Sequence, residues 1–333
     1  MRWSRVRSGA AVLLVAGACL SPTPAGAEPV PCREVRVPVA VAGTAQAVAG
    51  TLCAPAGSTT VQVLVPGGTY NRSYWDVSHQ PDTRSYRLAM NRAGIATLAV
   101  DRLGTGRSSR PPSALVTATT QAEAVHQVIR TLRPRFSRVV VGGHSIGSAM
   151  ALVEAGLHRD VDGVLVTGFT HRMNLVAVVP VLAGMVPAAL DPKFLGRTLD
   201  PGYLTTATGT RFRSFHAPGP EVPGAVALDE STKDVFSVAE AVDTPALNNV
   251  VVPFTRLVEA PVLIVVGEDN HFCGPPLGSD CSSAEALRAS EAPFFSPAAR
   301  LEAHVLPGYG HSINYAPNAP DFHRVVVAWT KGL

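Results

Sequence analysis

Once its first residues are set aside, the sequence lacks an excess of charge of either sign. The 333 residues include 28 Lys and Arg against 25 Asp and Glu, but three of the arginines (Arg2, Arg5 and Arg7) lie in a segment that we expect to be removed. The remaining chain then carries 25 groups of each sign. Proteins that bind nucleic acid present a basic face that follows the phosphates, so this balance excludes them as a class.

No hydrophobic run is long enough to predict a stable membrane span, which needs about 20 residues. Residues 10–20 are apolar but too few, and two prolines interrupt residues 175–190. The positive start, the short apolar run and the small residues 25–27 instead predict a signal peptide, residues 1–27, cleaved before Glu28. We therefore expect a secreted, extracellular protein. A lipid anchor at Cys19 is not expected, because the residues before it lack a large aliphatic side chain.

Cysteine is scarce, and it falls from five residues to four when Cys19 leaves with the signal peptide. An even number in an exported chain predicts disulfides, and four cysteines allow three pairings. We favour the local scheme, Cys32 with Cys53 and Cys273 with Cys281. Zinc is the competing interpretation, but neither pair has the Cys-x-x-Cys spacing and matching histidines of a zinc site.

Internal repeats and low-complexity tracts are also absent, whereas short β-branched runs alternate with helix-compatible segments. Such runs suit strands buried on both faces of a parallel sheet. The expected strands are 33–39 and 48–54, an antiparallel edge, followed by 61–65, 95–100, 139–142, 161–167, 261–266 and 304–306; the expected helices are 81–92, 117–132, 148–157 and 321–329. This alternation predicts an α/β fold.

One connection is far longer than the usual 2–6 residues. About 90 residues separate the strands at 161–167 and 261–266, and they are rich in Ala, Val, Leu, Pro and Gly. We expect residues 170–258 to form a helical cap over the carboxyl edge of the sheet. Residues 28–169 and 259–333 would then form the core.

The stretch 139–150 joins a buried strand to a helix through Gly143-His144-Ser145-Ile146-Gly147. This order predicts a nucleophile elbow, a tight turn that lifts Ser145 above the sheet. The elbow strains its central residue, and the flanking glycines let strand and helix pass closely. The backbone N–H of Ile146, at the helix N-terminus, would donate to a developing oxyanion.

With this elbow, four further motifs occur in the order typical of the α/β-hydrolase family, which the chain resembles over nearly all of its mature length. They are Pro66-Gly67-Gly68-Thr69, the loop from Asp101 to Ser108, Gly267-Glu268-Asp269 and Gly308-Tyr309-Gly310-His311. The resemblance, which is to secreted actinobacterial members, implies a mostly parallel eight-stranded sheet flanked by helices, with a helical cap. It implies no metal and no organic cofactor.

A serine hydroxyl needs a neighbouring base, and His311 follows the last strand in a glycine-rich turn. In the family the order is Ser, acid, His, and Asp269 follows the strand before the last. The acid often stands one position later, but that position holds Asn270. Either the loop is one residue shorter and Asp269 is the acid, which we favour, or Glu268 substitutes, or the acid comes from elsewhere.

The second oxyanion donor is expected in the turn after residues 61–65, at Gly68 or Thr69. The aromatic residues that follow, Tyr70, Tyr74 and Trp75, are candidates for lining the substrate pocket, although a core position is the commoner outcome for such residues.

Together these residues predict a secreted esterase or lipase-like serine hydrolase that forms an acyl-enzyme on Ser145, with a hydrophobic ester as its small-molecule substrate. Two alternatives remain open. The same triad would serve an acyltransferase or a lactone-forming or lactone-opening enzyme, and an altered acid would suit a binding protein that keeps the fold without catalysis. The sequence does not fix the oligomeric state.

Overall fold

The computed structural model describes residue 1 and residues 30–41, 43–245 and 254–333. The predicted signal peptide, its cleavage site and Cys19 lie outside the described residues. None of the helices within the described ranges is both long and apolar enough to cross a membrane.

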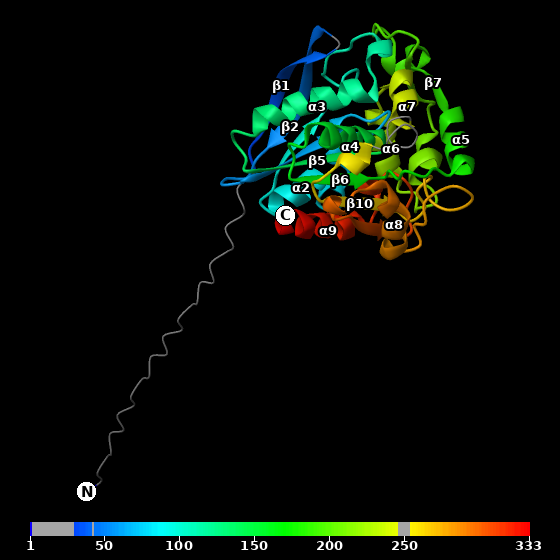
Figure 1. Cartoon of the computed structure of the whole chain (residues 1–333). Helices are drawn as coiled ribbons and strands as arrows, with labels where there is room; N and C mark the ends of the chain where they lie inside the picture. Colours follow the sequence, from blue (N-terminus) through cyan, green and yellow to red (C-terminus); the bar gives the residue numbers. More distant parts are fainter. Residues whose placement is uncertain (2–29, 42, 246–253) are drawn as a thin grey trace.

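An eight-stranded sheet forms the centre of the fold, and its first two strands are an antiparallel hairpin at one edge (Figure 1). In spatial order the strands are β1 (Cys32–Val41), β2 (Thr44–Cys53), β4 (Ala96–Val100), β3 (Thr60–Val65), β5 (Arg138–His144), β6 (Gly163–Thr167), β10 (Val262–Gly267) and β11 (Glu302–Leu306). From β4 to β11 all neighbours run parallel. The predicted mostly parallel sheet of eight strands is confirmed.

Helices cover both faces of the sheet, which explains why its central strands are buried throughout. α3 (Ala118–Leu132) and α4 (Ile146–His158) pack together on one face, and α1 (Pro81–Arg84), α2 (Tyr86–Arg92) and α9 (Ala319–Gly332) lie on the other (Figure 1). α8 (Ala284–Glu291) packs beside β11. Strands β3, β5, β6 and β10 are rich in valine, which packs well in a sheet shielded on both sides.

The single helix expected over residues 81–92 is divided into α1 and α2 at Ser85. Its backbone is extended (φ −78°, ψ 103°), and its hydroxyl accepts from the backbone N–H of Leu88 at 3.0 Å. Serine is a preferred N-cap because its oxygen satisfies a free N–H at the start of a helix. The cap therefore starts a second helix where the apolar pattern suggested continuity.

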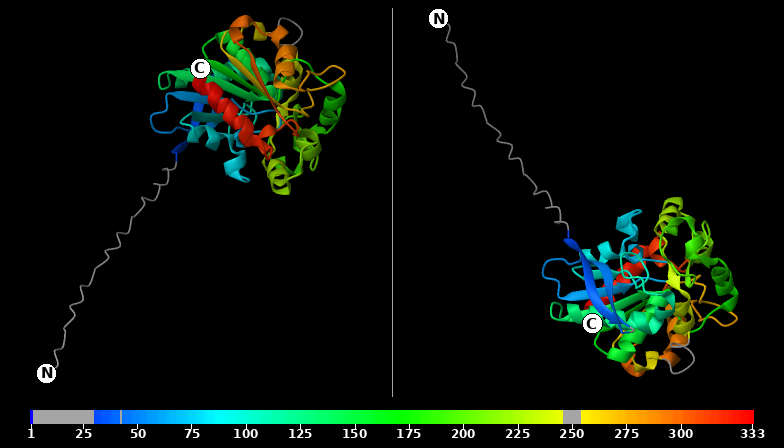
Figure 2. Two further views of the ribbon diagram at one scale, coloured as in Figure 1. Left: turned by 90° about the horizontal axis from the view of Figure 1, so that it is seen from below. Right: turned by 90° about the horizontal axis from the view of Figure 1, so that it is seen from above.

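The segment between β6 and β10 lies over the carboxyl end of the sheet, on the side away from the hairpin (Figure 2). It contains the helices α5 (Leu175–Ala183), α6 (Pro223–Thr232) and α7 (Val238–Pro245). It also contains a three-stranded antiparallel sheet of β7 (Met185–Pro187), β8 (Tyr203–Thr206) and β9 (Phe236–Ser237). We call residues 170–258 the cap segment.

Short turns of helix complete the described chain. They are η1 (Arg72–Trp75), η2 (Ser113–Leu115), η3 (Ala188–Leu190), η4 (Pro192–Phe194), the π-helical η5 (Phe212–His216), η7 (Phe254–Leu257), η8 (Ala292–Phe294), η9 (Pro297–Ala299) and η10 (Ile313–Tyr315).

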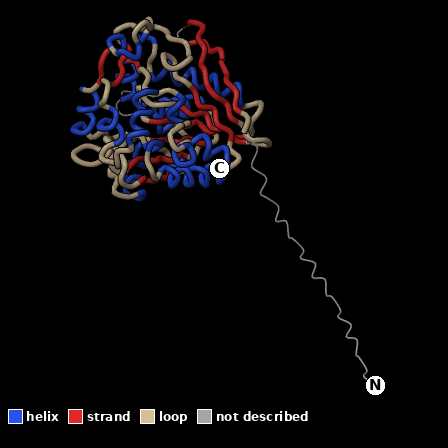
Figure 3. Tube along the Cα trace, turned by 180° about the vertical axis from the view of Figure 1, so that it is seen from behind, coloured by secondary structure: helices blue, strands red, loops and turns tan. Residues whose placement is uncertain are grey.

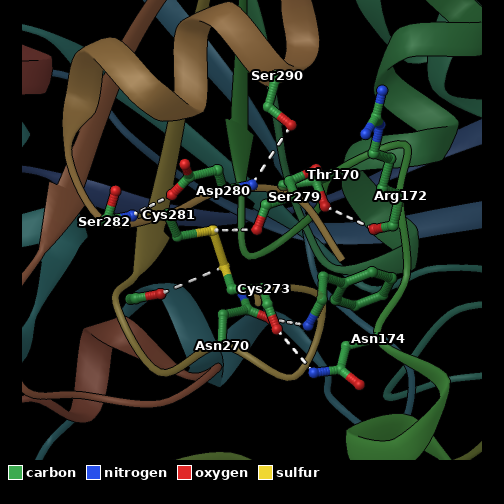
Figure 4. Close-up of a disulfide and its surroundings, with 12 residues drawn as sticks. Thr170, Arg172, Asn174, Asn270, Cys273, Ser279, Asp280, Cys281, Ser282 and Ser290 are labelled. Carbon is green, nitrogen blue, oxygen red and sulfur yellow. Dashed lines mark hydrogen bonds between the residues drawn. A yellow bond between two sulfur atoms is a disulfide. The ribbon is translucent and has the colours of Figure 1, made fainter. Parts of the chain in front are cut away.

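Two disulfides are present, with the pairing favoured from the sequence. Cys32 and Cys53 face each other at the open end of the β1–β2 hairpin, whose long strands run along one edge of the molecule (Figure 3). Cys273 and Cys281 close a short loop that follows β10 (Figure 4). The Asn174 amide, at the start of α5, donates to the carbonyl oxygen of Cys273 at 2.9 Å, so this loop is joined to the cap segment.

Candidate active site

The turn between β5 and α4 has the backbone of a nucleophile elbow. Ser145 has φ 55° and ψ −127°, a conformation that a non-glycine residue rarely adopts and that costs about 1–3 kcal/mol. Neighbouring β6 holds it in place, because the N–H of Ser145 donates to the carbonyl oxygen of Thr167 at 2.8 Å. The Thr167 hydroxyl in turn donates to the carbonyl oxygen of Gly143 at 2.8 Å.

Both glycines of the elbow are required by close contacts. A Cβ on Gly143 would lie 2.2 Å from the carbonyl oxygen of Gly147, and a Cβ on Gly147 would lie 2.5 Å from that of Pro66. These neighbours are backbone atoms, which cannot rotate away as a side chain can. The Gly-x-Ser-x-Gly spacing therefore reflects the passage of α4 close to β5 and to the turn after β3.

Two of the three predicted oxyanion donors line the cavity above Ser145, and the third lies behind it. Gly68 and Ile146 both line the cavity above Ser145, and a Cβ on Gly68 would lie 3.2 Å from the Ile146 side chain. No described residue accepts a hydrogen bond from the backbone N–H of either. Thr69 lies behind them: it is buried at φ 62°, and its hydroxyl accepts from the Arg211 guanidinium at 3.0 Å.

His311 is 2% exposed and lines the same cavity as Ser145. The cap segment fixes its loop, since the N–H of Gly310 donates to the carbonyl oxygen of His216 and the N–H of Ser312 donates to that of Phe215. The fold therefore brings the predicted nucleophile and the predicted base to one cavity from positions far apart in the sequence.

The side chain that lies beside Nδ1 of His311 is that of Asn270. Its Oδ1 lies 3.3 Å from Nδ1 and also accepts from the backbone N–H of Phe272 at 3.0 Å. The Phe272 contact fixes the orientation of the amide, because a backbone N–H faces an oxygen and not an NH₂ group. Nδ1 of His311 must then carry the proton and donate it to Asn270, which leaves Nε2 free as a base.

The structure does not place the acid preferred from the sequence, Asp269, beside His311. The Asp269 side chain is exposed and makes no hydrogen bond to His311 within the described residues. Burial and the neighbouring Glu268 raise the pKa of Asp269. Glu268 is exposed as well, and its carboxylate accepts from the N–H of Gly308 at 3.0 Å. The Asn270 N–H bonds back to Gly267, and this turn directs residue 270 inward and residue 269 outward.

Three histidine rings meet beside the cavity. The ring of His271 stacks on that of His311 with centroids 4.1 Å apart, and His144 lies 4.7 Å from His311. Burial, reinforced by His271 and His144, holds the pKa of His311 well below its ordinary value. Burial also lowers the pKa of His271 to about 4 and, with His271, that of His144 to about 3. The surroundings of all three rings therefore favour the neutral imidazole.

The cavity above Ser145 has a volume of about 240 Å³ and apolar walls. Three of the lining side chains (Val178, Val181 and Leu182) come from α5. The remaining apolar walls come from Phe169, Met173, Met185, Phe215, Phe236, Ala241 and Phe272. The aromatic candidates from the sequence do not line it, because Tyr70, Tyr74 and Trp75 are buried in the core.

A buried polar network behind the His311 loop had no sequence signal. The Asp229 carboxylate of α6 pairs with the Arg211 guanidinium at 2.7 Å and with Nε2 of His216 at 2.8 Å. The Tyr70 hydroxyl links the network to the residue after the base, since it lies 3.2 Å from Asp229 and 2.7 Å from the Ser312 hydroxyl. The network therefore connects the cap segment to the loop that carries His311.

Residues 62–321 match the profile of the Alpha/beta hydrolase family. The chain belongs to this family. No curated protein matches the sequence significantly. Among solved structures, this α/β hydrolase is similar to a thermophilic esterase from Thermogutta terrifontis (TM-score 0.58, 16% identity, 90% of this chain and 98% of that chain covered).

Two other similar structures are lipolytic. A structure described as a lipase in its open form has a TM-score of 0.59 and 16% identity, covering 90% of this α/β hydrolase and 98% of that chain. A structure from a study of the metagenome-derived lipolytic enzymes LipS and LipT has a TM-score of 0.55 and 16% identity, covering 85% and 97%. At such low sequence identity these structural similarities establish the fold alone.

Proposed function

We propose that this α/β hydrolase is a serine esterase that cleaves carboxylic esters with apolar acyl groups through an acyl-enzyme on Ser145. The observation that carries the proposal is the strained Ser145 at the N-terminus of α4, which shares an apolar cavity with a buried histidine. The esterase and lipolytic enzymes among the structural neighbours agree with this chemistry.

In the proposed reaction Nε2 of His311 takes the proton of the Ser145 hydroxyl as its oxygen attacks the ester carbonyl. Backbone N–H groups of Ile146 and of Gly68 or Thr69 stabilise the oxyanion, and each donor of this kind contributes about 10²–10³ in rate. The imidazolium then protonates the leaving alcohol. Water, activated by the same histidine, releases the acid and restores Ser145. Asn270 acts through His311 as a positioning residue.

The cavity volume supports a limit on the acyl group. About 240 Å³ lies below the range of about 300–1,000 Å³ typical of sites for drug-sized ligands. We therefore expect acyl chains of about four to eight carbons to react best.

A fluorophosphonate probe combined with nitrophenyl esters of increasing chain length tests the proposal. The wild-type chain is expected to label once and to turn over the shorter esters, and Ser145→Ala is expected to do neither. Ser231→Ala, which removes an exposed hydroxyl of α6, is the matched control and should behave as wild type. A folded wild-type protein without a Ser145 adduct would establish the non-catalytic alternative. Faster ester formation than hydrolysis in the presence of an acceptor alcohol would establish the acyltransferase.

We also propose that the protein is exported after cleavage before Glu28. The two disulfides support this location, because such bonds persist in oxidising compartments. N-terminal sequencing of protein recovered from the culture medium tests it. Glu28 is the expected first residue, and a cytoplasmic protein that retains residues 1–27 would refute the proposal.

A further inference from the structure

A second group of chemically reactive side chains lies between α3 and α4. His126 projects from α3, Glu154 from α4, and Asp160 follows the end of α4. One ligand atom from each lies within 4.8 Å of the other two. The reaction proposed above uses none of the three.

The spacing of these atoms suits a metal ion. Nδ1 of His126 lies 3.1 Å from Oδ2 of Asp160 and 3.4 Å from Oε1 of Glu154. Nitrogen and carboxylate oxygen bind zinc at about 2.0–2.2 Å, so the ligand atoms of a tetrahedral zinc site are about 3.4 Å apart. The distance to Glu154 equals that separation, and the distance to Asp160 is 0.3 Å shorter.

The three side chains include too few hydrogen-bond donors to satisfy the carboxylate oxygens of Glu154 and Asp160. Glu154 is 0% exposed, and neither of its carboxylate oxygens has a hydrogen-bond partner within the described residues. The same holds for Oδ1 of Asp160. The nearby Arg133 guanidinium is engaged elsewhere, donating to the Asp160 carbonyl and to the Asp162 carboxylate. When both carboxyls are ionised, the single N–H on Nδ1 of His126 cannot satisfy three oxygens.

Leaving a carboxylate buried in this way is costly, and proteins avoid the cost by protonation, pairing or metal binding. A divalent cation would neutralise both carboxylates. The donor set, one imidazole and two carboxylates, favours zinc over calcium or magnesium, which prefer oxygen ligands alone.

We propose that His126, Glu154 and Asp160 form a zinc site that fastens α3 to α4. Three protein ligands leave a fourth position for water. Zinc bound there would hold the far end of the helix whose first turn carries the nucleophile elbow, and its role would be structural.

The test uses untagged protein, treated with a chelator and dialysed, so that added ZnCl₂ is the sole metal. Calorimetric titration and elemental analysis are expected to give one zinc per chain, and saturating zinc is expected to raise the Tm by about 5 °C. Glu154→Gln and Asp160→Asn should each abolish the zinc-dependent rise. Asp160 is partly exposed, so its variant keeps the test valid if the buried substitution prevents folding.

Glu259→Gln is the matched control, because its exposed carboxylate pairs with Arg159 beside the proposed site. This variant should bind zinc as wild type does. Two results would overturn the proposal: no stoichiometric zinc in the wild type, or zinc binding that survives Asp160→Asn and disappears with His271→Ala. The second result would place the ion on the histidines beside the cavity.

Discussion

Replacing Asn270 with aspartate tests the proposed catalytic geometry most directly. The substitution keeps the size of the side chain and places a negative charge where Oδ1 now lies 3.3 Å from Nδ1 of His311. The backbone N–H of Phe272, which donates to Oδ1, remains available to the carboxylate. The main change is therefore a charge beside the proposed base.

The size of the effect follows from Coulomb attraction less desolvation. At an effective dielectric constant of about 20, unit charges about 4 Å apart attract by about 4 kcal/mol. Burying the new carboxylate removes part of this gain, so we expect about 1–3 kcal/mol to remain in favour of the imidazolium. The pKa of His311 should then rise by about 1–2 units, and kcat should rise about 10- to 100-fold on the alkaline plateau.

The assay is the pH dependence of kcat/KM with a short nitrophenyl ester. The wild-type base has a lowered pKa, so the neutral, active form should persist below the ordinary histidine pKa of about 6.5. The acid limb of the profile should therefore lie below that pH. In Asn270→Asp it should move to higher pH, because the carboxylate favours protonation of His311.

Asp269→Asn is the control for this experiment. Its side chain is exposed and makes no contact with His311 within the described residues, so kcat/KM and the acid limb should remain those of the wild type. An unmoved acid limb in Asn270→Asp, together with a large loss of kcat in Asp269→Asn, would refute the reasoning and restore Asp269 as the acid.

Three further substitutions test the elbow, the buried network and the cavity. Gly147→Ala should lower the Tm sharply, because its Cβ would lie 2.5 Å from a backbone oxygen, whereas Gly332→Ala meets nothing within 4 Å and should not; thermal melts compare them. Asp229→Asn should reduce the free energy of unfolding in urea by about 3–5 kcal/mol, because Arg211 would remain buried and unpaired. Arg211 and His216 lower the pKa of Asp229 to about 2 despite its burial. The contribution of Asp229 to the free energy of unfolding is therefore complete above about pH 4 and is lost as the pH falls through 2. An unchanged urea midpoint for Asp229→Asn at neutral pH would contradict this stabilising role. Val181→Trp should narrow the cavity and shift the preferred nitrophenyl ester to a shorter chain, and an unchanged preference would exclude Val181 from the acyl pocket.

The sheet was predictable because its strands carry their own signal. Valine-rich runs between turn residues predicted the central strands nearly to their ends, and the elbow glycines marked the turn after β5. The cap segment was less predictable. Its strands have two to four residues, as in Phe236–Ser237 and Tyr203–Thr206, which is too few for an alternating pattern to appear. Packing on neighbouring elements, not local preference, defines them.

In the predicted site, too, some residues were predictable from the local sequence and others depend on tertiary packing. Ser145 and His311 each stand in a glycine-rich turn at the end of a strand, so their placement follows from local sequence. The choice between Asp269 and Asn270 depends on how one turn is closed, and the preference for a charged residue selected the neighbour that does not contact His311. His126 and Glu154 lie on different helices, and only the packing of α3 against α4 brings them together.

A neutral Asn270 beside the proposed base favours cleavage of esters over cleavage of amides. Without a carboxylate, the imidazolium formed during acylation gains little stabilisation, and burial beside two other histidines weakens it further. Amide cleavage depends strongly on this imidazolium, because the poor leaving group must be protonated. An ester releases an alcohol that needs less assistance. In the proposed mechanism the backbone N–H groups of the oxyanion site would then supply most of the rate enhancement, which would favour esters over amides as substrates.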